Sequence, residues 1–546
     1  MVSVGFDKKR LFEILGFELD DRKLVEEIEK MGVSVEGIDK EKVSLEIYSN
    51  RPDLFSIIGF SRSLKNFLHR SKRYSYELGS DVFGSIEVEK EVSKVRPFIY
   101  ALYAKLEMNE EVKREVVNSI ETLSETLGRK RRKIAAGLHD LSKVRPPIRY
   151  CVEREGRFIP LGKEKEMSYE EIIREHEKGK EYGDLAKDGF LVLKDSLGAM
   201  SLIPIINSDR TKITKDTKEM LIDVTGTNEF YTSKVADILA CDLMDLGAEV
   251  KRIEINYPKK KVLSPLMETE RKYLYLRDIE SEIGVKIGEN NAVSLANKMG
   301  YRSAYEGRKI LFDIPPYRAD IIDEQDIIED MAIAYGYEYI MPFEIYSSQI
   351  GQRSGLDVFE EKIGLLMRSM GFTEVMSPYL TNSEKNFKKM RIEEAQKVEL
   401  EYSRESSINM LRTWIIPSLL EIAGRSQNEK MPINIFEFDA AFTIEQERPK
   451  QSYHLAALSM GPYIDFNFIK SVGKSIVSIL FGKDFEFAAI EHKSFIEGRA
   501  VEVRVKGKKL GFLGEIHPEV LSNFGIFEPC SALELELLDF VEVKGR

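Results

Sequence analysis

The chain has 546 residues, of which 43% are hydrophobic and 32% are charged, and its net charge of -11 gives a sequence pI near 5.5. This length is enough for roughly three to five domains, and the acidic balance argues against a protein that coats nucleic acid with its whole surface, although local basic patches can still bind RNA. No apolar run approaches the ~20 residues of a membrane helix, no secretory pattern is present, and three scattered cysteines form neither a disulfide framework nor a zinc motif, so we expect a cytoplasmic protein without a membrane partner.

Residues 1–83 are predicted to form an N-terminal α/β domain. Two short helices end at Gly16 and Gly32, and residues 43–47 alternate between apolar and polar side chains as in a strand. A further helix begins near Pro52, a residue that suits the first helical turn. The segment SNRPDLFS around this proline resembles the N-terminal domain of phenylalanyl-tRNA synthetase beta subunits of the archaeal and eukaryotic type.

Residues 84–262 are predicted to form a larger α/β domain. A helix over residues 112–127 ends at Gly128, and the strand-like segment IAAGLHDL follows it after a basic cluster. That segment contains His139, which is either a general base or, as is commoner for a lone histidine among apolar residues, a structural group. The cluster is either a solvated turn or a contact for RNA, and it consists of Arg129, Lys130, Arg131, Arg132 and Lys133.

The second half of this domain runs from FLVLKDS to LIDVTGTN and reads as strands joined by turns. It resembles the editing domain of the same synthetase family, in which a pocket hydrolyses tyrosyl-tRNA made by mistake. A separate pocket is physically necessary, because a site shaped for phenylalanine rejects an isostere that merely adds a hydroxyl by only ~100-fold.

Asp223, inside the apolar LIDVTG strand, is the best candidate to accept a hydrogen bond from the tyrosine hydroxyl. The resemblance supports this choice, because bacterial relatives carry an acidic pocket residue at the matching position. Asn207 and Ser208, with the backbone near Gly226 and Thr227, are candidates to position the ester and a water molecule. The alternative for Asp223 is a carboxylate satisfied by neighbouring N–H groups. No Ser-His-Asp or Cys-His arrangement is evident, so we expect hydrolysis by water rather than through a covalent intermediate.

Residues 263–341 contain the most distinctive stretch, PPYRADIIDEQDIIEDMAIAYGY. Asp323 is the expected N-cap of a helix, with Asp326 three residues later as in a capping box. Asp326, Glu329 and Asp330 are spaced to share one helical face, and Asp320 precedes them. Carboxylates so close together either form a solvated acidic face or supply the oxygen ligands that magnesium prefers.

This stretch resembles the magnesium-binding segment of the beta subunit. The resemblance implies a small winged-helix-like domain with an ion near the contact with the alpha subunit. Direct ligation by the last of the matching positions is the least secure, because aspartate stands there where glutamate is usual in bacteria. The four positions that match the family's metal-linked acids are Asp320, Asp326, Glu329 and Asp330.

Residues 342–546 are predicted to form an α/β domain with antiparallel strands. A helix ending at Gly371, the segment MLRTWIIPSLL and the strand INIFEFDAAF resemble the core of class II synthetases. Catalytic members hold ATP phosphates with two arginines. This segment contains no G-x-G-x-x-R and no well-placed arginine after Phe436 and Glu437, so the resemblance implies a degenerate core without synthetic activity.

The fold class we predict is therefore multidomain α/β and α+β, with the four domains 1–83, 84–262, 263–341 and 342–546. The resemblance implies a phenylalanine–tRNA ligase beta subunit that works with an alpha subunit as an (αβ)2 heterotetramer on tRNA(Phe). Magnesium and the substrate ATP would serve the assembled enzyme. Two alternatives stay open, namely a metal-dependent hydrolase that uses the acidic stretch and a non-catalytic tRNA-binding scaffold.

Overall fold

The computed structural model describes residues 1–70, 75–186, 189–344, 350–403, 405 and 407–537. The chain divides into two compact units, Met1–Glu344 and Ile345–Arg546. None of the helices within the described ranges is long and apolar enough to cross a membrane.

The first unit begins with a small antiparallel sheet of order β1-β3-β2. Its core side chains Val43, Leu45 and Ile47 are fully buried, as the alternating pattern predicts. The helix that follows β1 begins at the N-cap Asp7 and ends at Gly16, whose φ of 78° lies in the left-handed region that favours glycine. The elements here are β1 (Val2–Asp7), α1 (Lys8–Leu15), α2 (Asp21–Lys30), β2 (Ser34–Ile38), β3 (Lys42–Ile47) and α3 (Ile57–Phe67).

A larger sheet follows, and its strands run in the order β12-β11-β10-β7-β4-β14-β5-β13-β6, with β15 paired to β14. Its strands are β4 (Val82–Val88), β5 (Phe98–Lys105), β6 (Ile134–Asp140), β7 (Ile148–Glu153), β10 (Phe190–Asp195), β11 (Gly198–Ile203), β12 (Ile206–Asn207), β13 (Glu219–Gly226), β14 (Glu249–Asn256) and β15 (Lys261–Ser264). The accompanying elements are α4 (Glu110–Glu125), β8 (Arg157–Phe158), β9 (Met167–Ser168), α5 (Tyr169–Glu175), α6 (Glu177–Tyr182) and α7 (Glu229–Asp245).

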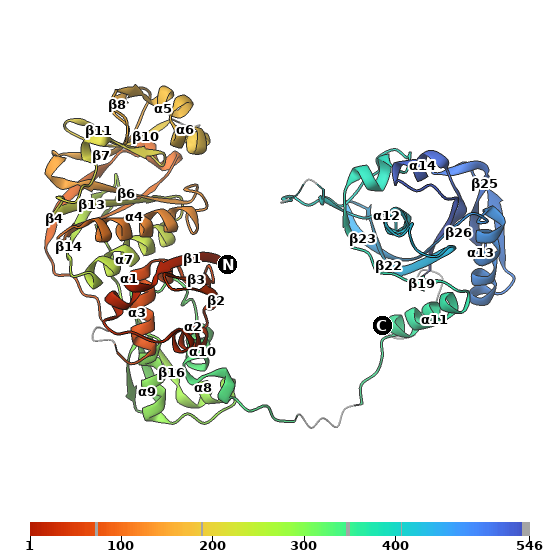
Figure 1. Ribbon diagram of the computed structural model, residues 1–546, viewed down its shortest axis with the longest axis horizontal. Coiled ribbons are helices and arrows are strands. Elements are labelled where there is room, and N and C mark those ends of the chain that lie inside the picture. Colours follow the sequence, from red (N-terminus) through yellow and green to blue (C-terminus); the bar gives the residue numbers. More distant parts are fainter. Residues whose placement is uncertain (71–74, 187–188, 345–349, 404, 406, 538–546) are drawn as a thin grey trace. The chain divides into compact units, whose positions relative to one another are not determined.

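The sheet curls until its two ends meet. The Nδ2 of Asn207 on the terminal strand β12 donates to the carbonyl oxygen of Leu138 on the opposite terminal strand β6, at 3.2 Å. The long helices α4 and α7 lie side by side below β6 and β13, whereas α5 and α6 lie at the other end of the domain beside β10 and β11 (Figure 1). A hollow can therefore form where α4 and the two meeting ends of the sheet come together.

The first unit ends with a three-stranded antiparallel sheet of order β16-β18-β17 and three helices. Buried side chains of these elements, such as Ile310, Phe312 and Ile327, belong to the same hydrophobic cluster as those of α1, α4 and α7, so this part of the unit shares one core with those helices. The elements are β16 (Glu270–Tyr275), α8 (Leu276–Ile283), α9 (Glu289–Lys298), β17 (Arg302–Glu306), β18 (Lys309–Ile314) and α10 (Glu324–Tyr335).

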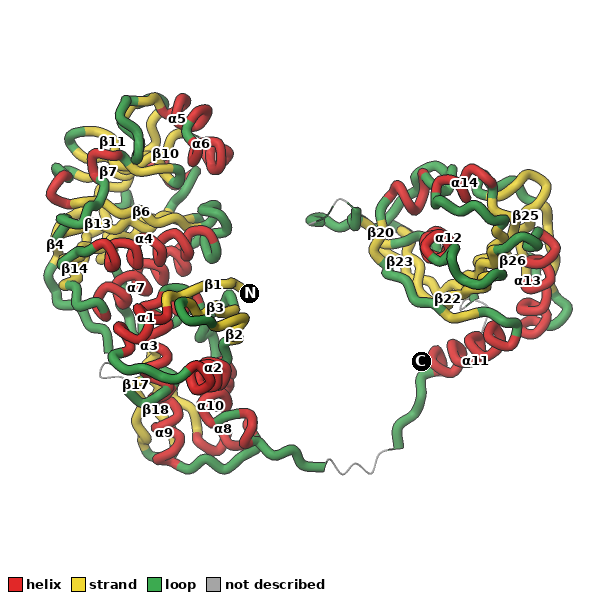
Figure 2. The backbone as a smooth tube through the Cα atoms, viewed as in Figure 1, coloured by secondary structure: helices red, strands yellow, loops and turns green. Residues whose placement is uncertain are grey.

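The second unit is built on a sheet of order β19-β22-β23-β27-β26-β25-β24, antiparallel except between β19 and β22. Figure 2 shows α12 inside the curve of this sheet, with α11 and α13 outside it. Gln446 and Glu447 have φ values of 50° and 61°, which suit the two-residue turn of the long β22–β23 hairpin.

The helices of the second unit are α11 (Gly355–Ser369), α12 (Ile416–Arg425), α13 (Phe466–Phe481) and α14 (Pro518–Asn523). Its strands are β19 (Thr373–Glu374), β20 (Leu380–Thr381), β21 (Met410–Leu411), β22 (Ile433–Glu445), β23 (Arg448–Met460), β24 (Phe485–Ala489), β25 (Phe495–Val505), β26 (Lys508–Ile516) and β27 (Cys530–Glu536). The end of the predicted last domain, residues 538–546, lies outside the described residues.

Candidate functional site

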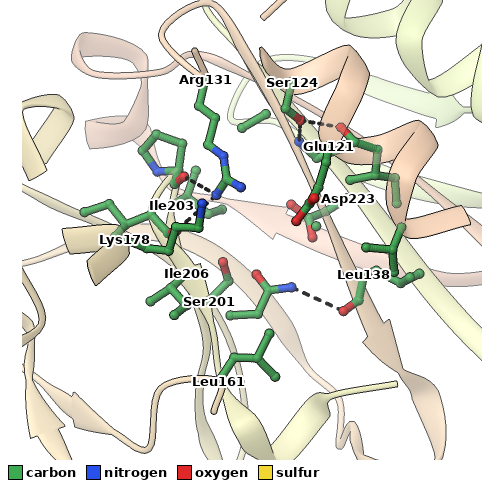
Figure 3. Close-up of a pocket in the computed structure, with 18 of the residues that line it drawn as sticks. Glu121, Ser124, Arg131, Leu138, Leu161, Lys178, Ser201, Ile203, Ile206 and Asp223 are labelled. Atoms are coloured by element: carbon green, nitrogen blue, oxygen red, sulfur yellow. Dashed lines mark hydrogen bonds between the residues drawn. The ribbon is translucent and has the colours of Figure 1, made fainter. Parts of the chain in front are cut away.

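A cavity of about 530 Å³ lies where the curled sheet meets α4. Its walls come from α4, β6, β11, β12 and β13, and apolar side chains such as Ile120, Leu138 and Ile203 supply most of the surface. Figure 3 shows Arg131 and Lys178 at one side of the cavity, across from Asp223. The volume suits a small organic group, because ligand pockets in proteins usually measure about 300–1,000 Å³.

Asp223 is only 2% exposed, yet it lines this cavity from the middle of β13. Its Oδ1 lies 3.1 Å from Nε2 of His139 on the neighbouring strand β6, and Nδ1 of the same ring lies 2.9 Å from Oγ1 of Thr211. An ionised carboxylate only accepts hydrogen bonds, so Nε2 donates to Asp223 and Nδ1 accepts from the threonine hydroxyl. His139 thus positions Asp223 rather than acting as an independent base.

The second carboxylate oxygen of Asp223 makes no hydrogen bond with any residue that the structure describes. The strand partner of Asp223 on β6 is Gly137, and a Cβ built there would lie 2.5 Å from Oδ1. Glycine therefore leaves the room that the carboxylate occupies. These features give the cavity a buried carboxylate acceptor in a mainly apolar wall, and the exposed carboxylate of Glu121 on α4 is the other acidic group of the lining.

The other predicted pocket residues divide into two groups. Asn207 lines the cavity, but Ser208 does not, because its hydroxyl caps the short helical turn at residues 209–211 by accepting from the N–H of Arg210. Thr227 also lies outside the lining, with its N–H donated to the carbonyl oxygen of Lys133. Strand alternation explains the shift for the threonine, since residues 223 and 225 share a face of β13.

Sequence reasoning missed three hydroxyl groups that do line the cavity, and one of them is Ser124 on α4. Ser201 lies on β11, and Thr225 lies two residues beyond Asp223 on β13. The period-2 pattern of β13 points to Thr225, but nothing local points to Ser201, whose approach depends on the closing of the sheet.

The acidic stretch forms α10, with the predicted capping box between Asp323 and Asp326 confirmed. The guanidinium of Arg318 donates to both oxygens of Asp320, at 2.8 and 2.7 Å, and to Oδ2 of Asp330, at 2.7 Å. Burial raises the pKa of Asp330, with Arg318 opposing the rise. For Asp320, burial is outweighed by the charge and hydrogen bonds of Arg318, and its pKa is lowered.

The carboxylates of this stretch do not fit a magnesium site in the arrangement described. Within the described ranges, no three or more His, Cys, Asp or Glu side chains are grouped so that they can hold a metal ion. Glu329 is exposed, and Oδ2 of Asp326 accepts from the N–H groups of Ile322 and Asp323. The spacing along the helix predicts which residues share a turn but not that Arg318 lies between Asp320 and Asp330.

Comparison with known proteins identifies the family. Three family models match the chain, namely the B3/4 domain at residues 85–240, the tRNA synthetase B5 domain at residues 273–337 and the phenylalanyl tRNA synthetase beta chain CLM domain at residues 344–537. The phenylalanine–tRNA ligase beta subunit of Archaeoglobus fulgidus is 35% identical over 99% of both chains, and that of Thermococcus sibiricus is 35% identical over 90% of both. The chain belongs to the phenylalanine–tRNA ligase beta subunit family.

A solved structure agrees with this family. The crystal structure of an N-terminal fragment of the phenylalanyl-tRNA synthetase beta subunit from Pyrococcus horikoshii aligns with a TM-score of 0.59 and 27% identity, covering 61% of this chain and 99% of the fragment. The mixed α/β multidomain fold is thereby confirmed. Beta subunits of this family are subunits of an aminoacyl-tRNA synthetase.

Within this beta subunit, the cavity lies in the region that matches the B3/4 model, and α10 lies in the B5 match. In the CLM match, Glu437 of the Phe436–Glu437 pair on β22 belongs to a buried hydrogen-bond network. Glu437 is 2% exposed and accepts from Nη1 of Arg412, at 2.7 Å, and from Oγ of Ser377, at 2.6 Å. Arg412 is itself fully buried and also donates to the carbonyl oxygen of Ala440.

Proposed function

We propose that this chain is the editing subunit of a phenylalanine–tRNA ligase, an enzyme that uses ATP to join phenylalanine to tRNA(Phe) and releases AMP and diphosphate. Synthesis takes place on an alpha subunit, and this chain supplies a scaffold, tRNA contacts and hydrolysis of tyrosyl-tRNA. The names of the relatives support the enzyme, and the absence of a G-x-G-x-x-R segment after residue 342 supports synthesis on the partner. As in tRNA ligases generally, ATP and magnesium serve the synthetic reaction.

The observation that carries the editing role is the second oxygen of Asp223. A buried carboxylate that has no donor for one oxygen recognises a ligand that brings one, and the tyrosine hydroxyl does so. Phenylalanine would contact the same apolar wall, but it would remove water from this oxygen without supplying a hydrogen-bond donor. Such sites reject the analogue that lacks the hydroxyl far more strongly than an apolar pocket rejects an added one.

Hydrolysis in this cavity uses water. The hydroxyls of Ser124 and Thr225 are engaged, since they donate to the carbonyl oxygens of Ile120 and Ala135. Ser201 Oγ and the side-chain oxygen of Asn207 make no hydrogen bond within the described residues and can orient the water and the ester carbonyl. Water adds to the ester carbonyl carbon, the bond from that carbon to the ribose oxygen breaks, and the ribose oxygen takes the proton.

The test measures deacylation of preformed tyrosyl-tRNA and phenylalanyl-tRNA by the chain assembled with its alpha partner. Asp223→Asn keeps the shape but removes the charged acceptor, so it should slow clearance of tyrosyl-tRNA and leave phenylalanine charging intact. The matched control is Asp216→Asn, an exposed acid outside the cavity lining. Equal loss of deacylation and charging in Asp223→Asn would refute a separate editing site.

A non-catalytic tRNA-binding scaffold is the alternative that this experiment addresses directly. Such a protein would show no deacylation of either ester while supporting full charging by its partner. A metal-dependent hydrolase receives no support from the acidic stretch, because the described carboxylates there are not grouped so that three of them could hold a metal ion.

Magnesium at α10 is a separate proposal. Asp326 and Glu329 remain as oxygen donors, and an ion would complete its ligands only if Asp320 or Asp330 exchanged Arg318 for it. Asp326→Ala should then reduce magnesium binding measured by calorimetry. The matched control is Asp357→Ala, which removes the corresponding residue of the capping box of α11. Equal magnesium binding in both variants would show that the acidic side chains of α10 are a solvated face rather than metal ligands.

The finer architecture and the assembly belong to the same proposal. The unit around α10 is winged-helix-like, the second unit is a degenerate class II core, and two alpha and two beta chains assemble in the cytoplasm as an (αβ)2 heterotetramer. Native mass spectrometry of the co-expressed chains tests the stoichiometry, and an αβ dimer would contradict it.

A further inference from the structure

The basic cluster of the sequence forms a turn in an unusual conformation. We call residues Arg129–Lys133, between α4 and β6, the basic turn. Arg129, Lys130 and Arg131 have φ values of 50°, 53° and 61° in succession. The left-handed region is unfavourable for residues with a side chain, and a run of three such residues persists only when the surrounding structure imposes it.

Backbone hydrogen bonds impose this conformation from α4. The N–H of Lys130 donates to the carbonyl oxygen of Glu125, and that of Arg131 donates to the carbonyl oxygen of Ser124, both at 2.9 Å. The N–H of Lys133 donates to the carbonyl oxygen of Gly128 at 2.8 Å. The basic turn is therefore a fixed structure rather than a floppy surface loop.

A buried arginine connects the basic turn to the cavity. Nη1 of Arg96 donates to the carbonyl oxygens of Arg131 and Arg132, at 3.1 and 3.3 Å. Its Nε and Nη2 donate to Oγ1 and the carbonyl oxygen of Thr225, at 3.0 and 2.9 Å. Arg96 is 4% exposed, and burial lowers its pKa to about 10, so it stays charged at neutral pH. The turn is thus bonded to β13 two residues from Asp223.

The side chains of the basic turn divide between the cavity and the solvent. Nη1 of Arg131 donates to the carbonyl oxygen of Ile205 at 3.1 Å, and its guanidinium lies 4.6 Å from the centre of the Tyr182 ring. It enters the cavity from the side opposite Asp223 (Figure 3). The other four side chains, those of Arg129, Lys130, Arg132 and Lys133, are exposed. None of these four has an acidic partner within 4.0 Å among the residues that the structure describes.

Adjacent cations without acidic partners repel one another, and a strained backbone adds to the cost. A turn whose charges are only solvated needs neither a row of unpaired cations nor a left-handed backbone, and it needs no buried arginine to hold its carbonyl groups. A polyanion bound to these side chains would offset the free energy of the charge repulsion and of the backbone strain. The lining of the cavity also contains the lysines Lys113, Lys178 and Lys212, each of which has an acidic partner, and the carboxylates Glu121 and Asp223.

We propose that the basic turn binds the phosphates of a single-stranded RNA end whose terminal ester enters the cavity. The identity of that RNA as an aminoacylated tRNA rests on the proposed function, but the affinity for an RNA backbone does not. The attached amino acid would lie against Asp223, while the sugar–phosphate chain leaves past Arg131. This places the phosphates of the last nucleotides over the basic turn.

The test compares two triple variants in the assembled enzyme. Arg129→Gln/Lys130→Gln/Arg132→Gln removes the proposed contacts, and Lys40→Gln/Lys259→Gln/Lys286→Gln removes the same charge from exposed positions outside the cavity lining. Each phosphate contact on a single strand contributes about 0.7 to the slope of log affinity against log salt. The first variant should therefore lower that slope by about 2 for a fluorescein-labelled single-stranded RNA, measured by anisotropy, and the control should leave it unchanged.

Hydrolysis separates this proposal from the editing proposal. The first variant should raise KM for tyrosyl-tRNA severalfold, and it should hydrolyse 2′(3′)-O-tyrosyl-adenosine, which has no phosphate, at the wild-type rate. An unchanged salt slope in the first variant overturns the basic turn as an RNA site. A wild-type enzyme that hydrolyses neither ester but loses RNA affinity in the first variant alone overturns only the editing function.

Discussion

Gly137→Ala tests the editing geometry without replacing a charged residue. The added Cβ would lie 2.5 Å from Oδ1 of Asp223 and 3.2 Å from its Cγ, whereas ordinary van der Waals contact begins at 3.4 Å. The φ of Gly137 lies outside the positive region, and its strand β6 is regular at that point, so alanine can take its backbone conformation. Oδ1 of the carboxylate must therefore move by about 0.9 Å, which is the difference between 3.4 and 2.5 Å.

That displacement is large for a recognition group. Oδ1 lies 3.1 Å from Nε2 of His139, so a shift of this size breaks the hydrogen bond or turns the ring away from Thr211. A misplacement of 1 Å can cost a catalytic site about 100-fold. We therefore expect single-turnover deacylation of tyrosyl-tRNA to slow by about 100-fold, which corresponds to about 2.7 kcal/mol of barrier.

The control is Gly84→Ala in β4 of the same sheet, where the added Cβ would meet nothing within 4 Å. Phenylalanine charging by the assembled enzyme should stay at the wild-type rate in both variants. Gly137→Ala enzyme that is folded and clears tyrosyl-tRNA as fast as the wild type would refute the role of Asp223. A parallel loss of charging would point to a general structural defect instead.

Three further predictions concern stability. Lys130→Gly should raise the free energy of unfolding by about 1 kcal/mol, because glycine adopts the positive φ of this position without strain. The same substitution should weaken RNA binding, since it removes a cation of the basic turn. A fall in Tm would contradict the stability prediction. Burial raises the pKa of Asp237 to about 7, so the folded chain keeps a proton that the unfolded chain releases above pH 4, and stability falls as the pH rises from 4 to 7. Asp237→Asn should reduce this fall, measured as the difference in Tm between pH 5 and pH 8. Arg412→Met leaves the buried Glu437 carboxylate without its arginine partner and should lower the free energy of unfolding in urea by about 3–5 kcal/mol. The double variant Arg412→Met/Glu437→Leu should lose less of this free energy, because no unpaired charge remains.

Local signals in the sequence predicted the features that a few neighbouring residues decide. The end of α1 at Gly16 follows from the positive φ that glycine allows, and the capping box of α10 follows from the spacing of Asp323 and Asp326. The apolar pattern of LIDVTG was enough to predict a strand that contains Asp223. Each of these depends on contacts within a single element.

The partners of the candidate residues could not be predicted in this way. His139 reaches Asp223 because β6 pairs with β13, although the two residues are 84 positions apart. Ser201 reaches the cavity only because the curled sheet brings β11 toward β6. Arg318 lies between Asp320 and Asp330, and the helical spacing that suggested a metal site contains no information about that cation.

Arg96 makes the proposed RNA site and the proposed amino acid pocket parts of one rigid structure. Removing a guanidinium from water is costly, and the cost is offset here by acceptors on both the basic turn and Thr225. If either side moved away, a buried charge would lose its partners, so the turn and β13 are held at a fixed separation. Phosphates bound at the turn would then determine where the terminal ester lies relative to Asp223. A pocket that distinguishes two amino acids by a single hydroxyl needs such a fixed reference, because the hydroxyl is recognised only at hydrogen-bond distance.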